Sequence, residues 1–384
     1  MSNICQASFL LFFLIWDGWL TNVAYAQDHQ IQLPKFQKTV SILMESGPMI
    51  QNGTEWGKHI NNNLTYRAMD FRLGFRNFKS PVYSTIYRYP TYGVGLYTAT
   101  FRNPYIGKPN AVYVYADIPF SKRYLEDRLS FSYFATLGIS SNLTPFDPDT
   151  NPLNLFIGSY QNGYTHIGFT SRYRIWENMY VDGSIGLKHF SNGSFRKPNS
   201  GLNFIPFTIG IRSYLDKVDF ENVPKHVPAT FKPHNQINIF TSIGSKNYVI
   251  GERQFLKAGI GANFLRQINY KYRFGLGLDM FYSDGVENRV ADADLNFLDN
   301  NSFAVVGSWE WVLNKNLYVP VAIGTYLNRN DFNDETTWYY QRLGLRYRFN
   351  NNVFTGITLK AHGFKADFFE FTVGYTLMKD LNKY

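Results

Sequence analysis

Apolar and polar positions alternate with a period of two along most of this chain, which is the pattern of β-strands. In 129–140, the clearest case, odd positions such as Leu129 and Phe131 are apolar, whereas even positions such as Ser130 and Ser132 are small or polar. We therefore predict an all-β fold. The segments that carry this alternation are 38–45, 65–76, 91–102, 111–120, 129–140, 164–176, 179–190, 203–215, 236–244, 255–266, 270–282, 303–313, 317–327, 338–349, 353–362 and 367–377.

The length of these segments separates a membrane barrel from a soluble sandwich. Strands of about 10–12 residues fit a tilted crossing of a bilayer, and they exceed the roughly five or six residues that are usual in globular proteins. An apolar face opposite a small or polar face is typical of membrane barrels, whose apolar side meets lipid. We predict a transmembrane antiparallel β-barrel of roughly 14–16 strands, possibly built from two related eight-strand halves. We expect one large ring rather than two tandem small barrels.

The N-terminal residues predict a secretory signal peptide, 1–26. Residues 8–20 form a short apolar run, and the small-residue sequence Ala-Tyr-Ala follows at 24–26 as a cleavage site. The run is shorter than the roughly 20 residues that a membrane-spanning helix needs. The only cysteine, Cys5, leaves with this peptide, so we expect the exported chain to contain no thiol and no disulfide.

The remaining chain divides into two halves around a Pro-rich polar stretch, 216–235, which we interpret as a linker or a long periplasmic turn. We expect 27–215 to form the half that carries the candidate chemistry and 236–384 to form a second half without it. The halves share short sequences. Arg-Tyr-Arg occurs at 172–174 and again at 346–348, each time before a turn and another strand.

Charge and loop length indicate the surroundings of such a barrel. The chain has a net charge of +9, but its basic residues alternate with apolar ones, so we expect no nucleic acid partner. A long loop at 141–163 contrasts with a tight turn at 177–178. Outer-membrane barrels have short periplasmic turns and longer extracellular loops. We therefore predict a multi-pass barrel among the lipids of a Gram-negative outer membrane. The sequence indicates no oligomeric state.

Three potentially catalytic side chains continue the apolar stripe of 179–190. His189 and Ser191 lie two positions apart on one face, so about 6.6–6.8 Å separates their Cβ atoms, and Asn203 begins the next antiparallel strand on the same face. In such a set His189 takes the proton of Ser191 while Asn203 orients the imidazole. Because this face meets lipid near the outer rim, we expect acyl transfer from a membrane lipid ester.

The loop after Ser191 supplies candidates for an oxyanion site. Asn192, Asn199 and the backbone N–H of Gly193 are each able to donate to the negative charge that develops on an attacked carbonyl oxygen. The alternative interpretation is a polar extracellular loop in which Ser, Asn and Gly simply make turns.

The second half and the other histidines offer no comparable chemistry. Alignment of Lys188 with Lys360 places Ala361 and Gly363 at the positions of the first half's histidine and serine. The six histidines other than His189 form no ligand-like cluster with carboxylates. We therefore expect no metal and no cofactor.

The sequence His189-x-Ser191-Asn192, followed by Asn199-x-Gly201, resembles the lipid A 3-O-deacylase (acyloxyacyl hydrolase-like) family of outer-membrane β-barrel enzymes. The likeness covers mainly the segment around this motif and extends loosely over the first half as an eight-strand barrel. The second half lies outside it.

This resemblance implies an esterase that acts on lipopolysaccharide. It implies Ser191 as the nucleophile, His189 as the base, and Asn192 and Asn199 as oxyanion candidates. The family has a glutamate where Asn203 stands here. A neutral amide stabilises an imidazolium less than a carboxylate does, so the third position departs from the family pattern.

The motif is also similar to outer-membrane phospholipase A, whose Asn follows its Ser by twelve residues, as Asn203 follows Ser191. The Ser- and Arg-rich calcium-binding segment of that family is missing between Gly193 and Asn203, and the Asn199-x-Gly201 element favours the deacylase. We predict an outer-membrane serine esterase that removes an acyl chain from lipid A. The alternatives are a phospholipase A and a barrel without catalysis, such as a pore or a structural protein.

Overall fold

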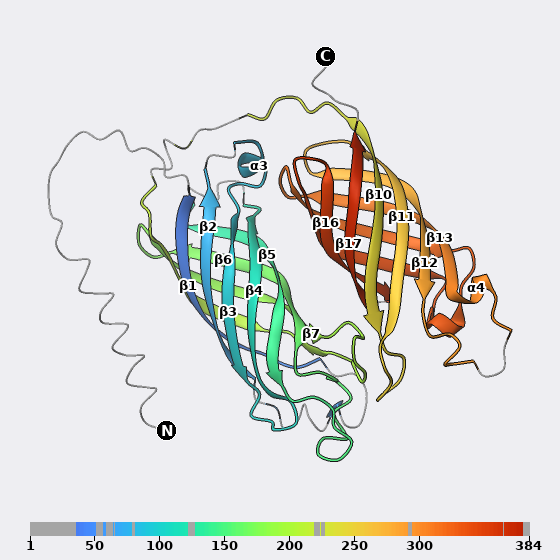
Figure 1. The fold of residues 1–384 in the computed structure, drawn as a ribbon. Helices are drawn as coiled ribbons and strands as arrows, with labels where there is room; N and C mark the ends of the chain where they lie inside the picture. Colours follow the sequence, from blue (N-terminus) through green and yellow to red (C-terminus); the bar gives the residue numbers. More distant parts are fainter. Residues whose placement is uncertain are drawn as a thin grey trace. The chain divides into compact units, whose positions relative to one another are not determined.

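The structure, a computed structural model, describes residues 36–50, 57–58, 64, 66–78, 81–121, 127–218, 223, 227–290, 294–363 and 365–378. The chain divides into two units, Met1–Leu33 and Pro34–Tyr384, and every described residue belongs to the second. The predicted signal peptide lies outside the described residues. Regular structure is almost entirely antiparallel β-strand (Figure 1), which confirms the predicted all-β fold.

The first half of the described chain closes into an eight-strand barrel. Its sheet runs in the order β6-β5-β4-β3-β2-β1-β9-β7-β8, and a further pairing of β6 with β7 completes the ring. The strands are β1 (Phe36–Ser46), β2 (Arg67–Asn77), β3 (Thr91–Thr100), β4 (Gly107–Pro119), β5 (Leu129–Leu143), β6 (Asn162–Arg174), β7 (Met179–Ser191), β8 (Leu202–Phe204) and β9 (Phe207–Tyr214).

The second half forms another closed ring, in which each strand pairs with its neighbours in the sequence and β17 returns to β10. The strands are β10 (His234–Lys246), β11 (Phe255–Gln267), β12 (Tyr272–Ser283), β13 (Asn301–Val312), β14 (Leu317–Tyr326), β15 (Tyr339–Arg348), β16 (Val353–His362) and β17 (Lys365–Met378). All the segments predicted from alternation overlap these strands.

The expectation of one large ring was wrong: the chain forms two tandem eight-strand barrels. The reason lies in the pairing of the terminal strands of each half. β1 pairs antiparallel with β9, for example Ile42 opposite Ile211, and β10 pairs antiparallel with β17, for example Ile239 opposite Tyr375. The first and last strands of each half therefore pair with each other, and neither half has an unpaired strand edge to join the other.

The segment predicted as one strand, 203–215, is divided into β8 and β9 at Ile205 and Pro206. Proline has no backbone N–H to donate to a sheet. Ile205 turns to another partner, and its N–H donates to the carbonyl of Pro48 at 3.0 Å. β8 and β9 both pair with β7, so together they occupy the position of one strand in the barrel.

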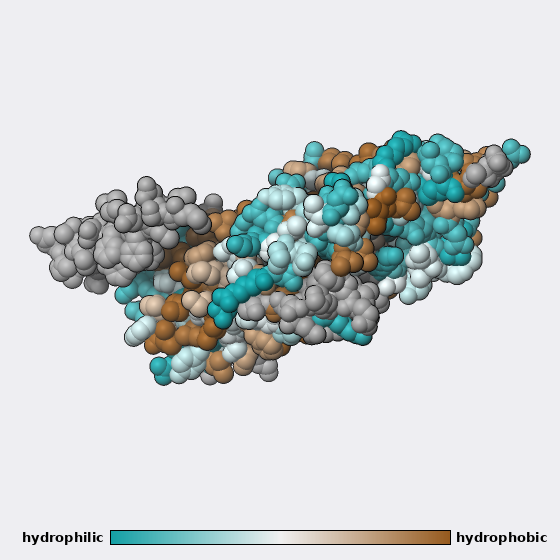
Figure 2. Space-filling view, turned by 90° about the horizontal axis from the view of Figure 1, so that it is seen from below, coloured by the Kyte–Doolittle hydropathy of each residue, from teal (hydrophilic) through white to brown (hydrophobic). Residues whose placement is uncertain are grey.

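The outward face of the strands is apolar. β1 alternates strictly between exposed and buried side chains, and outward residues such as Ile209 (63% exposed) and Leu276 (68% exposed) lie open on the barrel surface. Figure 2 shows such hydrophobic surface beside hydrophilic patches. An apolar surface of this extent is unfavourable in water and favourable against hydrocarbon.

The helices whose bounds the structure gives are short connections between strands. These are α3 (Pro81–Ile86), α4 (Phe297–Asn300) and the 3₁₀ turn η2 (Asp331–Asn333). None of the helices among the described residues has the length and apolar character that a membrane crossing requires.

Charged side chains fill the interior of the first barrel. The Arg172 guanidinium contacts Asp117 at 2.7 Å and Asp182 at 2.8 Å, and the Arg212 guanidinium contacts both of the same carboxylates at 2.8 Å. All four side chains are buried. Buried charges are tolerated only when each has an opposite partner and hydrogen bonds, and this four-residue cluster meets that condition.

Replacement of Asp182 by asparagine tests this cluster. The change leaves two buried guanidinium groups facing one carboxylate, so we expect Asp182→Asn to lower the free energy of unfolding by about 3–5 kcal/mol. Urea unfolding in detergent micelles, followed by tryptophan fluorescence, measures the effect. Glu177→Gln is the control, because the Glu177–Lys217 pair at 3.4 Å is exposed. Equal unfolding midpoints for Asp182→Asn and wild type would contradict the prediction.

Candidate active site

Strand β7 places the candidate catalytic residues on the outer side of the first barrel. Ile185 (45% exposed) and Leu187 (52% exposed) point outward, while Lys188 and Phe190 are buried in the interior. Side chains alternate along a strand. His189 and Ser191 therefore share the outward face, as the alternation in the sequence predicts. His189 is partly buried and Ser191 is buried at the end of the strand.

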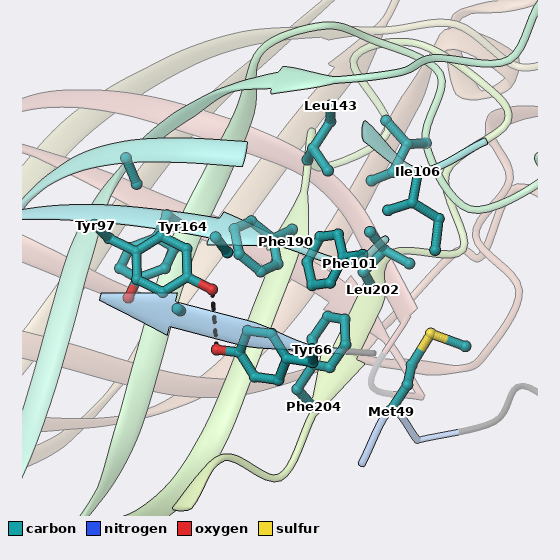
Figure 3. Packing of buried hydrophobic residues seen from close by; sticks show 14 of the residues in the cluster. Met49, Tyr66, Tyr97, Phe101, Ile106, Leu143, Tyr164, Phe190, Leu202 and Phe204 are labelled. Carbon is teal, nitrogen blue, oxygen red and sulfur yellow. Dashed lines mark hydrogen bonds between the residues drawn. The ribbon is translucent and has the colours of Figure 1, made fainter. Parts of the chain in front are cut away.

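A cluster of aromatic side chains fixes the strands behind this site from the barrel interior (Figure 3). Phe190 of β7 and Phe204 of β8 pack edge to face, with ring centroids 6.3 Å apart. Phe204 also stacks on Phe101, with ring centroids 5.1 Å apart. Lys188 pairs with Glu45 and lies 3.9 Å from the ring centroid of Tyr97. The packing of these inward side chains restricts the backbone of β7 and β8, which also carries His189 and Asn203.

Asn203 orients the histidine. His189 and Asn203 are opposite each other in the pairing of β7 with β8, and 2.7 Å separates His189 Nδ1 from Asn203 Oδ1. The amide oxygen can only accept a hydrogen bond, so this contact requires the proton on Nδ1 and leaves Nε2 free to accept one. The carbonyl of Asn203 also accepts the Ile50 N–H at 2.8 Å, which holds β8 in place.

Gly201 allows this arrangement of His189. Its φ angle is +73°, a left-handed conformation that glycine adopts without steric cost. A Cβ atom at this position would lie 2.7 Å from His189 Cε1, closer than non-bonded atoms tolerate. The glycine of the Asn-x-Gly element is therefore required both by the backbone and by the imidazole next to it.

Two N–H donors converge on the hydroxyl of Ser191. Gly193 N donates to Ser191 Oγ at 3.1 Å, and Asn199 Nδ2 donates to the same atom at 2.8 Å. The backbone N–H of Asn192 holds the Asn199 amide by donating to its Oδ1 at 3.1 Å. No hydrogen bond between His189 and Ser191 is present among the described residues. Catalytic hydrogen bonds are often long in ligand-free structures and shorten when substrate binds.

The side chain of Asn192 faces another part of the site. Its Nδ2 donates to Ser159 Oγ and to the Arg196 carbonyl, both at 2.8 Å, and its Oδ1 accepts the Arg196 N–H at 3.3 Å. In this structure the Asn192 side chain thus braces the loop 192–200, which we call the site loop. Of the three oxyanion candidates, Gly193 and Asn199 are the two whose donors reach Ser191.

The long loop between β5 and β6 supports the site loop from the first barrel. The Gly201 N–H donates to the carbonyl of Phe156 at 3.0 Å, and the Ser200 N–H donates to the carbonyl of Leu155 at 3.3 Å. The sequence did not identify Ser159 or these carbonyls as parts of the site. Serine in a polar loop has no distinctive spacing, and a backbone carbonyl leaves no signal in the sequence.

Metal-binding groups of three or more His, Cys, Asp or Glu residues are absent from the part of the chain that the structure describes. One ion pair at the site loop joins Lys197 to Asp334, 3.6 Å apart. Burial lowers the pKa of Lys197 below its ordinary value, although Asp334 acts to raise it. The site itself consists of neutral hydrogen-bonding groups.

Family comparison identifies both halves of the chain. Residues 69–212 match the model of lipid A 3-O-deacylase (PagL), and residues 235–380 match that of the acyloxyacyl hydrolase C-terminal domain. The second match was not anticipated from the sequence, since the resemblance noted there was confined to the first half. No match was found among curated proteins.

Solved outer-membrane proteins share only low similarity with the chain. An outer membrane channel from Pseudomonas putida F1 is 10% identical, with 93% of this chain and all of the channel covered and a TM-score of 0.19. The ferric enterobactin receptor of Pseudomonas aeruginosa is 10% identical, with 86% of this chain covered and a TM-score of 0.23. The chain spans about half the length of that receptor, 54%.

The two family matches lie side by side in the sequence and correspond to the two rings. The first includes β7 and the site loop, and the second includes β10 to β17. The chain therefore belongs to the lipid A 3-O-deacylase family and carries the acyloxyacyl hydrolase C-terminal domain as its second barrel.

Proposed function

We propose that this protein is an outer-membrane serine esterase that removes an ester-linked acyl chain from lipid A, with Ser191, His189 and Asn203 as its catalytic residues. The observation that carries the proposal is the surroundings of the Ser191 hydroxyl. Two N–H donors meet at this oxygen, and a histidine two residues away on the same lipid-facing strand is oriented by Asn203.

The proposed reaction begins with attack of Ser191 Oγ on the ester carbonyl carbon of the substrate. The proton of the hydroxyl passes to His189 Nε2, which Asn203 leaves available by holding the Nδ1 proton. The carbonyl oxygen becomes an oxyanion, and the N–H groups of Gly193 and Asn199 are placed to stabilise it. These two donors bond the resting hydroxyl in the absence of substrate, so they are already oriented before the reaction.

The tetrahedral intermediate then collapses. The bond to the sugar oxygen breaks, the imidazolium of His189 returns its proton to that oxygen, and the acyl chain stays on Ser191. A water molecule, deprotonated by His189, attacks the acyl-enzyme; the bond to Ser191 Oγ breaks, the imidazolium returns the proton to Oγ, and the fatty acid leaves. The same donors stabilise both intermediates because the attacked carbonyl carbon is bonded to Ser191 Oγ in each.

The position of the site supports a membrane lipid as substrate. The proposed catalytic side chains continue the face that carries exposed Ile185 and Leu187, so an acyl chain in the bilayer would lie along the strand that ends at Ser191. Family membership favours lipid A, the substrate that gives the lipid A 3-O-deacylase family its name.

A phospholipid is the second candidate substrate. One observation favours it: the third catalytic position holds an amide, Asn203, whose oxygen contacts His189 at 2.7 Å. An asparagine in this role resembles outer-membrane phospholipase A. The substrates are separated by measuring both lipid classes in the same cells.

Substitution of the nucleophile tests the proposal directly. We expect cells that express the wild-type protein to contain lipid A with one acyl chain fewer, and cells that express Ser191→Ala to retain the full set, because alanine has no attacking oxygen. Mass spectrometry of extracted lipid A and phospholipids reads out both substrates. Loss of chains from phospholipids alone would replace lipid A by phospholipid as the substrate, and identical spectra for wild type and variant would exclude the esterase.

Substitution of Asn203 tests the orientation of the imidazole. Asn203→Leu removes the acceptor of the Nδ1 proton, so we expect kcat to fall by about 100-fold, the lower range for loss of general acid–base catalysis. Asn203→Asp keeps an acceptor and adds the negative charge of the family's carboxylate, so it should retain at least wild-type kcat. Purified protein with lipopolysaccharide in mixed micelles provides the assay. A Leu variant as active as wild type would remove Asn203 from the catalytic set.

Gly201 provides a test of the geometry around His189. Gly201→Ala strains a backbone with φ +73° and pushes a methyl group against the imidazole, so we expect deacylation to fall by about tenfold or more, as small misplacements of catalytic groups do. Gly183→Ala on the same side of the barrel is the control, because nothing lies within 4 Å of a Cβ atom there. Equal loss of activity in both variants would argue against a specific role for Gly201.

A further inference from the structure

The second barrel contacts the site loop at several points. Ser194 Oγ donates to the carbonyl of Ala366 in β17 at 3.0 Å, and Gln254 Nε2 donates to the carbonyl of Phe195 at 3.1 Å. These contacts join two parts of the chain that are far apart in sequence. They fall on the segment between Ser191 and Asn199.

Lys197 makes the densest set of these contacts. Its backbone N–H donates to Asn247 Oδ1 at 2.9 Å, and its Nζ donates to the carbonyl of Tyr248 at 2.7 Å. Nζ also lies 3.6 Å from the carboxylate of Asp334. Burial alone would raise the pKa of Asp334, but Lys246 and Lys197 lower it below its ordinary value. The carboxylate therefore stays ionised at neutral pH and pairs with the lysine.

Phe369 of β17 supports the donor next to the nucleophile. A Cβ atom on Gly193 would lie 2.4 Å from Phe369 Cδ2, and one on Gly163 would lie 3.4 Å from Phe369 Cζ. Gly193 supplies the N–H that bonds Ser191 Oγ, and Gly163 is the residue opposite Ser191 in the pairing of β6 with β7. The phenyl ring thus packs against both backbone segments that adjoin Ser191.

The second barrel presents these groups from a well-braced surface. Lys246 Nζ contacts Asp367 at 2.5 Å and Asp334 at 3.2 Å. Glu252 Oε2 accepts the N–H of Tyr248 at 2.8 Å, and the Arg289 guanidinium lies 3.5 Å from the centroid of the Tyr248 ring. Charged pairs and a cation–π contact of this kind restrict the loop between β10 and β11. The groups of this loop that accept hydrogen bonds from Lys197 are therefore held in fixed positions.

We propose that the second barrel positions the oxyanion donors of the first, with Asn247 and Phe369 as positioning residues. This inference rests on the proposed esterase function. The site loop loses conformational entropy when its donors are oriented toward one oxygen. Unless other contacts order the loop beforehand, this free-energy cost adds to the barrier of the reaction. The second half supplies such contacts at Ser194, Phe195 and Lys197, while the loop between β5 and β6 supplies others at Ser200 and Gly201.

Variants of the full-length protein distinguish this role from simple attachment of the barrels. Asn247→Leu removes the acceptor for the Lys197 N–H, and Phe369→Ala removes the ring beneath Gly193. We expect each to lower kcat by about tenfold with KM unchanged, because the substrate still binds but the donors are misplaced. Asn247→Asp keeps the acceptor oxygen and should restore kcat to within about twofold of wild type.

The control is Phe371→Ala, an outward residue of the same strand that is 58% exposed and remote from the site loop in the strand register. We expect it to leave kcat unchanged. The rate at which a fluorophosphonate labels Ser191 gives a second readout, and it should fall in Asn247→Leu and Phe369→Ala but not in Phe371→Ala or Asn247→Asp. Urea unfolding of each variant shows whether both barrels remain folded.

The outcomes separate the two proposals. Wild-type kcat and labelling in both Asn247→Leu and Phe369→Ala, with Ser191→Ala inactive, would overturn the positioning role and leave the esterase intact. A change in KM alone, or equal losses in Phe371→Ala, would likewise overturn it. A wild-type protein that hydrolyses neither lipid A nor phospholipid would overturn the esterase and, with it, the positioning role.

Discussion

Closure of the sheets is the constraint on which the rest of this structure depends. Within hydrocarbon every backbone N–H and C=O needs a partner, so a strand edge cannot be left open. The pairings β1–β9 and β6–β7 close the first sheet, and β10–β17 closes the second. A ring of about eight strands has an interior just wide enough for side chains, and here ion pairs such as Arg172–Asp182 occupy it. Chemistry on a lipid therefore has to take place on the outside.

Because side chains alternate along a strand, β7 contributes both to the packed interior and to the outer face within a few residues. On β7, Lys188 and Phe190 point into the barrel and are held by Glu45 and by the aromatic cluster. His189 and Ser191 point the other way, to the lipid side. The same hydrogen-bonded backbone thus links the packed interior to the face that carries the candidate catalytic residues. Asn203 completes the arrangement because β8 pairs directly with β7.

Both barrels contact the site loop. The first supplies the candidate nucleophile, base and oxyanion donors, and its β5–β6 loop holds one side of the site loop. The second barrel contacts the same loop through hydrogen bonds such as that from Lys197 to Asn247. A further contact joins the barrels near α3, where the Tyr87 hydroxyl donates to the carbonyl of Val312. The second barrel has Ala361 and Gly363 at the positions that align with His189 and Ser191.

The sequence by itself determined the strands, the outward face of His189 and Ser191, and the family motif, because alternation and motif spacing are local properties. It also placed Asn203 beside His189, since antiparallel neighbours follow from one short connection. Only the tertiary structure decided that the strands form two rings, that Gly193 and Asn199 rather than the Asn192 side chain reach Ser191 Oγ, and that the second barrel contacts the site loop. These features depend on which distant strands pair and on how a loop orients its hydrogen bonds, and neither is encoded by a local pattern.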